Sequence, residues 1–595
     1  MTRGPLVRLA CAILCLVPAP LLAQFGDEGA PVAPTSHAES APRASAVRAD
    51  QPISIDGRLT EAVWASAPAI TGFTQLDPVE GAPGTQRTEV RIAYDDNAIY
   101  IGAMLHDTGE IRTQLARRDG SMSESDVFEV VFDSYHDHQT AYRFATNPSG
   151  MKRDALVIGN GSDSSWDPVW DVATQQSAEG WSVEMRIPFS QLRFSREAEQ
   201  TWGLQVERTI RRNQESMQFS FTPKLERGGV QRYGHLEGIR DIRPGRRLEL
   251  LPYATARAEY IHQTRPDGVL FEPLRSDSEA FAGAGLDLKY RLSSNATLDA
   301  TVNPDFGQVE VDPAVINLTA FETRFQERRP FFIEGAEIFR FGEGGPTGST
   351  GRPAEVLYSR RIGRAPQGGA PSNAIYRDEP SATTILGAAK LTGKLGGGWS
   401  VGFLEAVTGR ETAAYLDPQG ARSEAVVEPA SNYLVARVRR DVRGGATRFG
   451  GIFTALNRDL PAGPLGQRLH SAAYTGGVDL IHEWDNRSWR LSGSLSPSLV
   501  LGDPAVIART QQTSSRYFQR PDARHLELDP TATRLSGYYA MAELNKLAGN
   551  WTGRLGLGAT SPGYEVNDVG FQSYADRLIV DTHLQYNQTR PGRYL

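Results

Sequence analysis

The feature that most constrains the fold is an alternation of apolar and polar residues that recurs from Leu248 to the end of the chain. Each segment spans about 10 residues, which suits a β-strand with one face toward lipid and the other toward a polar lumen. Two examples are Ala284, Leu286, Leu288, Tyr290 and Leu292, and then Trp489, Leu491, Gly493 and Leu495. We therefore predict a transmembrane antiparallel β-barrel over residues 246–595.

A soluble β-sandwich is the alternative, because its strands also alternate with a period of two. Three features disfavour it: a predicted export signal, segments longer than the usual ~5–6 residues, and aromatic residues near segment ends, where interfacial girdles lie. These aromatic residues are Tyr260, Tyr290, Trp399, Tyr433, Trp489 and Trp551. Roughly thirteen segments follow Leu248, whereas single-chain bacterial barrels normally have an even number of strands. The sequence is therefore expected to be a barrel truncated at its C-terminus.

The alternation fails between about residues 304 and 364. A stretch of this length with polar and aromatic content is long for a hairpin loop. An inserted plug is the favoured interpretation, since a polar lumen tolerates irregular backbone. An extended extracellular loop is the alternative.

Residues 1–23 are typical of a secretory signal peptide. Arg3 and Arg8 precede a mostly apolar stretch, and Ala23 supplies a small residue at the cleavage point. Residues 24–50 are rich in Ala, Pro and Ser and predict a flexible linker. Both cysteines, Cys11 and Cys15, lie inside the signal, so the mature chain has neither disulfides nor thiolate-bound zinc.

The charge balance excludes one class of partner. The chain has 63 Lys and Arg against 70 Asp and Glu, a net charge of −7, and nucleic-acid binding needs a basic surface. No later stretch reaches ~18 uninterrupted apolar residues, so no transmembrane helix is expected. An exported chain of this kind is periplasmic, extracellular or part of the outer membrane.

Residues 51–243 show short alternating runs separated by turn signals. Val90–Tyr94 alternates, Asp95–Asn97 predicts a turn, and Ala98–Met104 resumes an apolar strand. Val127–Phe132 and Trp181–Ile187 alternate in the same way. This pattern predicts an all-β chain that begins with an antiparallel β-sandwich.

Two sets of motifs resemble known families. The first set is Ile55-Asp56-Gly57 with Glu61 and Trp64, then Asp95–Tyr100, Ser125–Asp133 and Gly180–Phe189. It resembles the family 9 carbohydrate-binding module. The second set is Asn303–Phe339, Tyr358–Arg364 and Ser561–Phe571, and it resembles the DUF5916 barrel family that often follows such a module.

The resemblance implies sugar binding by the sandwich, with calcium as a structural ion in some relatives. The barrel family has no assigned activity. Many motif residues have structural explanations, since Asp56-Gly57 suits a turn and large aromatics such as Trp64 and Trp181 are most often core residues.

Sugar recognition needs aromatic faces that pack on the C–H side of a pyranose, with planar polar groups for its hydroxyls. The segment Asp163–Asp171 provides both, because it contains two tryptophans flanked by carboxylates. The predicted carbohydrate-binding residues are Trp166, Trp170, Arg118, Arg143, Asn147 and Asp171. The alternative is that both tryptophans close the edge of the sandwich core.

Calcium would be held by carboxylates and carbonyls, and the candidate ligands are Asp126, Asp133 and Asp163. No Asp-x-Asp-x-Asp-Gly loop occurs, so solvated turn carboxylates are the competing interpretation. His136 and His138 could ligate a transition metal, but a third ligand is not identifiable from the sequence, which favours a polar turn.

Catalytic motifs are not found, so no catalytic residue is predicted: His482-Glu483 is not followed by a second histidine at the spacing of a zinc protease, and no Gly-x-Ser-x-Gly elbow occurs. The expected function is binding or uptake of oligosaccharide or cell-wall glycan in carbohydrate catabolism, at the bacterial outer membrane with the sandwich on the periplasmic side. Outer-membrane lipid is the other expected partner. The alternatives are an enzyme that hydrolyses O-glycosyl compounds, and a structural barrel whose sandwich no longer binds sugar.

Overall fold

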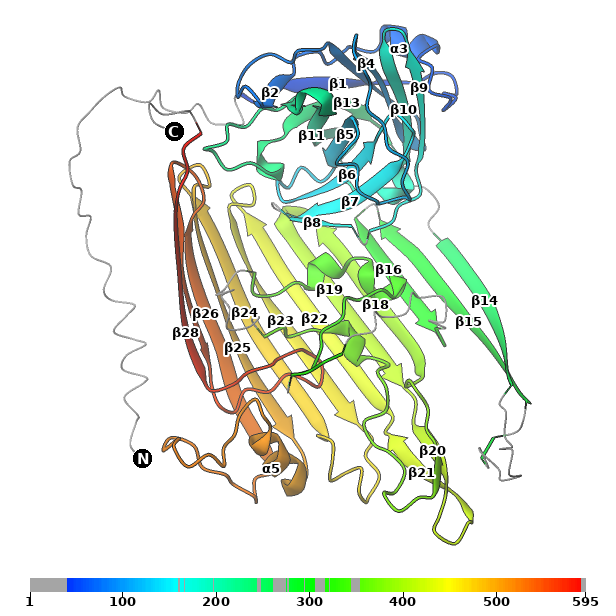
Figure 1. The fold of residues 1–595 in the computed structure, drawn as a ribbon, viewed down its shortest axis with the longest axis vertical. Coiled ribbons are helices and arrows are strands. Elements are labelled where there is room, and N and C mark those ends of the chain that lie inside the picture. The colour runs from blue at the N-terminus through cyan, green and yellow to red at the C-terminus, as the bar shows by residue number, and fades with distance from the viewer. Residues whose placement is uncertain are drawn as a thin grey trace, which may run out of the picture. The chain divides into compact units, whose positions relative to one another are not determined.

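The computed structural model describes residues 40–158, 161–164, 166–195, 197–242, 248–260, 274–275, 278–293, 295–304, 316–319, 322–343 and 354–589. The predicted signal peptide and most of the predicted linker lie outside these ranges. The described chain is all-β, as predicted: a β-sandwich precedes a large antiparallel sheet of barrel type (Figure 1). Within these ranges no helix is long and apolar enough to cross a membrane.

The sandwich consists of two sheets joined by one strand, β1 (Arg43–Arg48). Residues 43–45 of β1 pair in parallel with β13, and residues 46–48 pair in parallel with β3. The predicted linker of residues 24–50 is therefore wrong at its end, because Ala44 and Ala46 are buried in the core while Ser45 between them is exposed. The alternation of small apolar residues in this strand is too short to be distinguished from the Ala-rich segment around it.

Sheet I has the strand order β8-β7-β6-β5-β11-β13, in which β12 also pairs with β11 and β2 pairs with β12, and sheet II has the order β3-β4-β10-β9. The strands of sheet I are β2 (Thr74–Asp77), β5 (Val127–Asp133), β6 (Thr140–Thr146), β7 (Lys152–Ile158), β8 (Gly161–Asp163), β11 (Glu199–Ile210), β12 (Glu215–Gln218) and β13 (Gly234–Arg240). Those of sheet II are β3 (Thr88–Tyr94), β4 (Ala98–His106), β9 (Asp171–Ser177) and β10 (Gly180–Pro188). The short helices are α3 (Ala62–Ser66), η1 (Phe189–Gln191), η2 (Arg211–Asn213) and η3 (Val230–Arg232).

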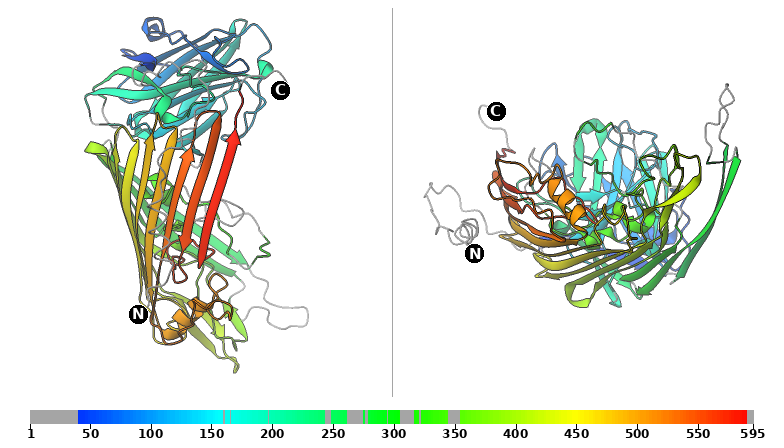
Figure 2. Two further views of the ribbon diagram at one scale, coloured as in Figure 1. Left: turned by 90° about the vertical axis from the view of Figure 1, so that its left-hand side faces the viewer. Right: turned by 90° about the horizontal axis from the view of Figure 1, so that it is seen from below.

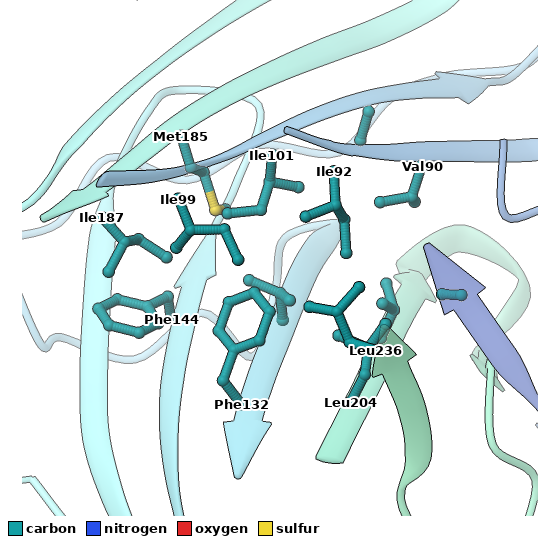
Figure 3. Packing of buried hydrophobic residues seen from close by; sticks show 14 of the residues in the cluster. Val90, Ile92, Ile99, Ile101, Phe132, Phe144, Met185, Ile187, Leu204 and Leu236 are labelled. Carbon is teal, nitrogen blue, oxygen red and sulfur yellow. The ribbon is translucent and has the colours of Figure 1, made fainter. Parts of the chain in front are cut away.

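The core of the sandwich lies between the two sheets. Every second residue of β3, β4 and β10 meets every second residue of β5, β6 and β11, as Figure 3 shows for Ile101, Phe132 and Leu204. All three are completely buried, and burial of a side chain of this size stabilises the fold by about 1.5–3 kcal/mol.

The family 9 motif residues form a second buried cluster on the outer face of sheet II. Trp64 of α3 packs there, and its indole N–H donates to Glu184 Oε1 at 2.9 Å. Glu184 Oε2 accepts the backbone N–H groups of Asp56 (3.0 Å) and Gly57 (2.9 Å). Gly57 has φ +85°, and a Cβ there would lie 2.9 Å from the backbone of Thr174. These motif residues therefore hold the α3 segment on the sheet, as their structural interpretation expects.

The second region, here called the barrel sheet, has twelve antiparallel strands. They are β14 (Leu248–Tyr260), β15 (Ser278–Ser293), β16 (Ala296–Val302), β18 (Ile385–Leu395), β19 (Trp399–Thr408), β22 (Ser431–Val442), β23 (Thr447–Arg458), β24 (Ala472–Trp484), β25 (Trp489–Leu501), β26 (Arg534–Lys546), β27 (Trp551–Thr560) and β28 (Arg577–Tyr586). A separate three-stranded sheet contains β17 (Tyr376–Asp378), β20 (Glu411–Leu416) and β21 (Arg422–Glu428). In the described residues, β14 and β28 are the two edges of the barrel sheet and are not paired with each other.

The barrel sheet has its apolar side chains on the outside. On β25, Leu491 and Leu495 are 39% and 47% exposed, whereas Ser494 and Ser496 on the other face are buried. β19 repeats the pattern with Phe403 exposed and Ser400 buried. The sheet is curved, and short helical segments lie on its concave side (Figure 2). The polar residues thus face the interior of the curve, as the sequence pattern predicts.

Connections differ at the two ends of the strands. At one end the turns are short: residues 294–295, 396–398 (η6, Gly396–Gly398), 443–446, 485–488 and 547–550. At the other end they are long: residues 261–277, 303–384, 409–430, 459–471, 502–533 and 561–576, the fifth of which contains α5 (Pro504–Gln512).

The short turns contact the sandwich. Lys394 forms an ion pair with Asp137, the backbone N–H of Gly549 donates to Leu225 O at 2.7 Å, and Arg227 pairs with Glu483. The Arg227 and Glu483 side chains are only 5% and 2% exposed. The sandwich therefore docks on the short-turn end through buried charge pairs.

Residues 322–343, the longest described part of the predicted plug, lie against the inner face of the barrel sheet. They include α4 (Pro330–Ile333) and η4 (Ala336–Phe339), and a third short helix, η5 (Ser359–Arg361), follows. Lys390 of β18 donates to the carbonyl oxygens of Phe331 and Glu334, and the N–H of Gly342 donates to Asp479 at 3.2 Å. These contacts support the plug interpretation over the extended extracellular loop.

Candidate functional site

A cavity of about 440 Å³ lies where the sandwich, the inner face of the barrel sheet and the plug segment meet. We call it the junction cavity. Its lining from the sandwich is Tyr142, Leu156, Trp166, Asp167 and residues 190–193. Its lining from the barrel sheet is Lys289, Arg291 and Thr297, and from the plug segment it is Arg328, Pro330, Ile333, Glu334, Gly335 and Glu337. Its volume is within the ~300–1,000 Å³ usual for small-molecule sites.

One predicted sugar-binding residue, Trp166, lines this cavity. Its ring is partly buried and lies 4.9 Å from the ring of Tyr142 and 5.6 Å from that of Phe144, between ring centroids. Trp166 therefore closes one end of the sandwich core and also presents part of its surface to the cavity.

The prediction that Trp170 contacts sugar is wrong, and the alternative, in which it closes the edge of the sandwich core, holds for this residue. Its side chain is 1% exposed, its ring lies 5.3 Å from that of Phe144, and its indole N–H donates to Asp154 Oδ1 at 2.8 Å. The segment turns between the two residues, so that one indole enters the core while the other stays at its rim. Sequence spacing alone does not specify this turn.

Arg118 holds the loop that contains Trp166 against strand β7. Its guanidinium donates to Asp154 Oδ1 (2.7 Å) and to Pro168 O (2.6 Å), and it lies 2.6 Å from Asp167. Burial raises the pKa of Asp154, and hydrogen bonds from Trp170 and Arg118 oppose that shift. Arg118 thus acts on the loop beside the cavity and is not one of the residues that line it.

The remaining predicted sugar ligands lie elsewhere. Arg143 is on the outer face of sheet I, where it pairs with Glu129 at 2.8 Å and lines a separate cavity of about 370 Å³ with Glu207. Asn147 is completely buried: its amide donates to Gln114 O at 2.7 Å and its carbonyl accepts the N–H groups of Ser149 and Met151. Asp171, at the start of β9, pairs with Arg186 at 3.3 Å. The six predicted residues are therefore not brought together at one site.

The predicted calcium ligands are also separated. Asp126 precedes β5 and Asp133 ends it, so they lie about 20 Å apart along the strand. Asp163, on β8, lies 3.6 Å from Arg340 of the plug segment. The carboxylates of Asp119, Asp154 and Asp167 do converge within 4.8 Å, but the Arg118 guanidinium already lies among them. The structure therefore does not assemble the predicted calcium site.

Charged groups of opposite sign face each other across the junction cavity. Lys289 of β15 pairs with Glu334 of the plug segment at 2.5 Å, and Arg193 of the sandwich lies 4.0 Å from the same carboxylate. Burial would lower the pKa of Arg193, but neighbouring acidic groups, with Glu337 the largest, outweigh it and raise that pKa. Arg291 donates to Ser190 O, which joins the barrel sheet to the sandwich at the cavity wall.

Sequence reasoning missed Tyr142, Arg193 and Glu334 as cavity residues. Tyr142 and Arg193 sit in stretches that indicate only a strand and a loop, and they meet Trp166 through the packing of the sandwich. Glu334 belongs to a motif that resembles a known family, but the motif does not indicate where in the fold this residue lies. Its place beside Arg193 depends on the plug segment entering the curve of the barrel sheet.

Two family profiles match the chain. Residues 55–218 match "Carbohydrate family 9 binding domain-like", and residues 244–444 match "Domain of unknown function (DUF5916)". A search of curated proteins found no match.

Solved structures similar to each region were also found. A family 9 carbohydrate-binding module from Caldicellulosiruptor kristjanssonii in complex with cellotriose is 15% identical and covers 34% of this chain and 96% of its own, with a TM-score of 0.26. A putative carbohydrate-binding protein from Bacteroides uniformis is 17% identical over 33% of this chain and 100% of its own, with a TM-score of 0.27. The outer membrane channel DcaP of Acinetobacter baumannii is 6% identical over 84% of this chain and 97% of its own, with a TM-score of 0.23. On its two family matches, the chain carries a carbohydrate family 9 binding domain-like module followed by a DUF5916 domain.

Proposed function

We propose that this chain is an outer-membrane protein whose sandwich binds an oligosaccharide in the junction cavity, at the periplasmic end of a barrel through which the glycan is taken up. The observation that carries this proposal is the shared lining of the junction cavity. A ligand there would touch Trp166 of the carbohydrate-binding-module-like sandwich and Lys289 of the inner barrel face at the same time.

The outward apolar face of the barrel sheet supports its place in a membrane. Exposed apolar side chains recur on neighbouring strands: Phe403, Phe449, Phe453, Val478, Leu480, Leu491, Leu495 and Leu555 are between 39% and 60% exposed. A soluble monomer rarely exposes a continuous apolar surface of this kind, whereas a lipid-facing barrel requires one. Hydrocarbon is therefore the solvent that best fits this face.

The two kinds of connection support a periplasmic sandwich. Outer-membrane barrels have short turns on the periplasmic side and longer loops outside the cell. The sandwich contacts the short-turn end of the barrel sheet, through the Lys394–Asp137 and Arg227–Glu483 pairs among others. We therefore place the sandwich in the periplasm.

The chemistry of the junction cavity suits a sugar. Aromatic rings pack against the C–H face of a pyranose, and charged groups hydrogen-bond its hydroxyls. Trp166 and Tyr142 supply the rings, and Arg193, Lys289 and Glu334 supply donors and acceptors. Because the four cations of the lining are nearly balanced by its three carboxylates, a neutral oligosaccharide fits better than a strongly charged one.

Calorimetric titration of the full chain in detergent micelles with cellotriose and a panel of other neutral oligosaccharides tests this proposal. We expect saturable binding that Trp166→Ala weakens at least tenfold without lowering the melting temperature by more than a few degrees. The matched control is Val169→Ala, three residues along the same loop, where the side chain is 70% exposed and outside the cavity.

The competing function is a purely structural sandwich that docks the barrel. Trp170 and Asn147 favour this function, because both are buried and their polar groups are hydrogen-bonded within the protein. Absence of binding to every sugar, or unchanged affinity with a large loss of stability in Trp166→Ala, would replace our proposal with this one.

A further inference from the structure

Four side chains form a stacked row on the outer face of the barrel sheet, at the short-turn ends of β24, β25 and β26. They are His482, Trp484, Trp489 and Lys546, and we call them the rim cluster. The ring centroids of His482 and Trp484 are 5.6 Å apart, those of Trp484 and Trp489 are 6.1 Å apart, and the interplanar angles are 17° and 9°. The Lys546 ammonium lies 5.6 Å from the centroid of the Trp489 ring. We propose that the rim cluster binds the phosphate group of a glycerophospholipid.

Strand register holds the rim cluster together. Trp489 of β25 is directly opposite Trp484 on one side and Lys546 on the other, and directly opposite side chains on one face of a sheet interact. His482 is two residues before Trp484 and so lies on the same face. Its Nδ1 is 2.9 Å from the hydroxyl oxygen of Thr447, its direct neighbour on β23. The cluster is therefore built into the folded sheet and does not need a ligand to form.

The rim cluster lies where the apolar outer face ends. The next outward positions toward the middle of the same three strands are Leu480, Leu491 and Leu544, which are 41%, 39% and 36% exposed. The short turns of residues 485–488 and 547–550 follow on the other side. Aromatic and cationic side chains at such a boundary meet the headgroup region of a bilayer. Because the phosphate groups of phospholipids lie at that depth, they are the anions nearest to Lys546.

The arrangement of the rings favours a phosphate over a sugar. A pyranose packs on the free face of an aromatic ring, whereas Trp484 uses both of its faces for the rings of His482 and Trp489. The edges of the rings and the Lys546 ammonium remain available to a ligand. Indole N–H groups and an ammonium are hydrogen-bond donors only, and a phosphate oxygen accepts from both.

A second pair of the same kind lies at the same end of the sheet. Arg440 of β22 lies over the ring of Trp399 of β19, 5.1 Å from its centroid, and the two residues are direct neighbours across the strands. At the opposite end of β26 the outward cation is Arg534, whose direct neighbour on β25 is Leu501. Both pairs of a cation and a tryptophan ring therefore lie at the short-turn end, which the proposed function places at the periplasmic leaflet.

Because such a site rests on the membrane placement proposed above, the test uses two lipids with the same brominated acyl chains. One is phosphatidylglycerol and the other is a diacylglycerol, which has no phosphate. Each is titrated into the full chain in maltoside micelles, where bromine on a bound acyl chain quenches tryptophan emission. We expect wild type to bind phosphatidylglycerol roughly fivefold more tightly than diacylglycerol. Lys546→Gln should remove most of this preference, and Lys546→Arg, which keeps the charge, should retain it.

The matched control is Arg534→Gln, which removes an outward cation from the opposite end of the same strand and should keep the preference. The proposal fails if wild type binds the two lipids equally, or if Arg534→Gln loses the preference as Lys546→Gln does. Charge alone would then account for the binding. If neither lipid quenches the emission, the outer face does not meet acyl chains and the membrane placement itself is wrong.

Competition with inorganic phosphate distinguishes a lipid from a free anion. Millimolar phosphate should not displace phosphatidylglycerol from wild type, because the lipid also gains contacts between its acyl chains and the exposed leucines Leu491 and Leu544. Displacement would mean that the rim cluster is a site for the free anion, and the lipid would not be its ligand.

Discussion

The sandwich and the barrel sheet use the same alternating strand in opposite ways. In the sandwich, Phe128 and Phe132 of β5 point inward and are completely buried. In the barrel sheet, Leu491 and Leu495 of β25 point outward, and the two buried positions between them are serines, Ser492 and Ser494. The period of two defines only that a strand has two different faces. The solvent on each side decides which face is apolar.

The interiors of the two regions also differ in the charged groups that they contain. Inside the barrel sheet, Arg437 of β22 is 1% exposed and makes two hydrogen bonds to Asp479 of β24, at 2.8 and 2.7 Å. In the sandwich, Glu184 on the outer face of sheet II accepts hydrogen bonds from backbone and indole N–H groups, and Asp107 pairs with Arg212 at 2.6 Å. Buried charge pairs therefore occur in both regions, but the space between the two sheets of the sandwich is filled by apolar side chains.

The largest expected effect comes from the same substitution made in each region. Phe132→Ala should destabilise the sandwich by about 3–5 kcal/mol, because it removes buried apolar contacts and leaves a cavity. Phe453→Ala on β23, which is 43% exposed on the outer face, should cost less since lipid or detergent fills the space. Urea denaturation followed by tryptophan fluorescence measures both, and equal losses would contradict the opposite orientation of the two faces.

A charge on the outer face should be the next largest effect. Leu495→Arg should destabilise the barrel in lipid vesicles by about 2–4 kcal/mol if this position lies near the middle of the bilayer, and less near its surface. Leu495→Met is the control and should fold normally. Folding into vesicles, followed by the shift in gel mobility of unheated samples, gives the measurement. Normal folding of Leu495→Arg would mean that this face does not meet hydrocarbon.

Acidic groups on sheet I should make the stability of the sandwich depend on pH. Burial and the nearby Glu129 raise the pKa of Glu207 to about 7, so the folded state retains a proton that the unfolded state has lost. Stability should be complete below about pH 4.5 and should fall as the pH rises toward 7. Glu207→Gln keeps an acceptor for Gln218 and should remove much of this fall, a gain on the order of 1–2 kcal/mol at pH 8. Denaturation of wild type and Glu207→Gln at pH 5 and pH 8 gives the measurement. If the unfolding free energy of the variant falls with pH as steeply as that of wild type, Glu207 is not the source of the pH dependence.

The smallest expected effect is at the sandwich surface. Arg43 of β1 pairs with Glu237, but their side chains are 63% and 39% exposed, and surface ion pairs contribute about 0–1 kcal/mol. Arg43→Ala should therefore change the unfolding free energy by less than about 1 kcal/mol. Ala44→Asp, at the neighbouring buried position, should be far more damaging. If Arg43→Ala were the worse of the two, the parallel pairing of β1 would not be what holds this strand.

Much of the architecture was predictable because it follows from periodicity. The sandwich and the barrel strands appear where the alternation starts and changes. The strand that the sequence did not predict is β1 (Arg43–Arg48), because its short Ala-rich sequence cannot be distinguished from that of a linker. Of the predicted site residues, only Trp166 lines the junction cavity.

The sequence by itself determined the strand pattern, the family motifs and the identity of the core tryptophans, because these depend on residues close together in the chain. Only the tertiary structure decided which residues share a site. Trp166 lines the same cavity as Lys289 and Glu334 because the sandwich docks on the short-turn end of the barrel sheet, and His235 reaches His136 from a strand about a hundred residues away. Such contacts depend on how separate elements pack, and local alternation carries no information about that packing.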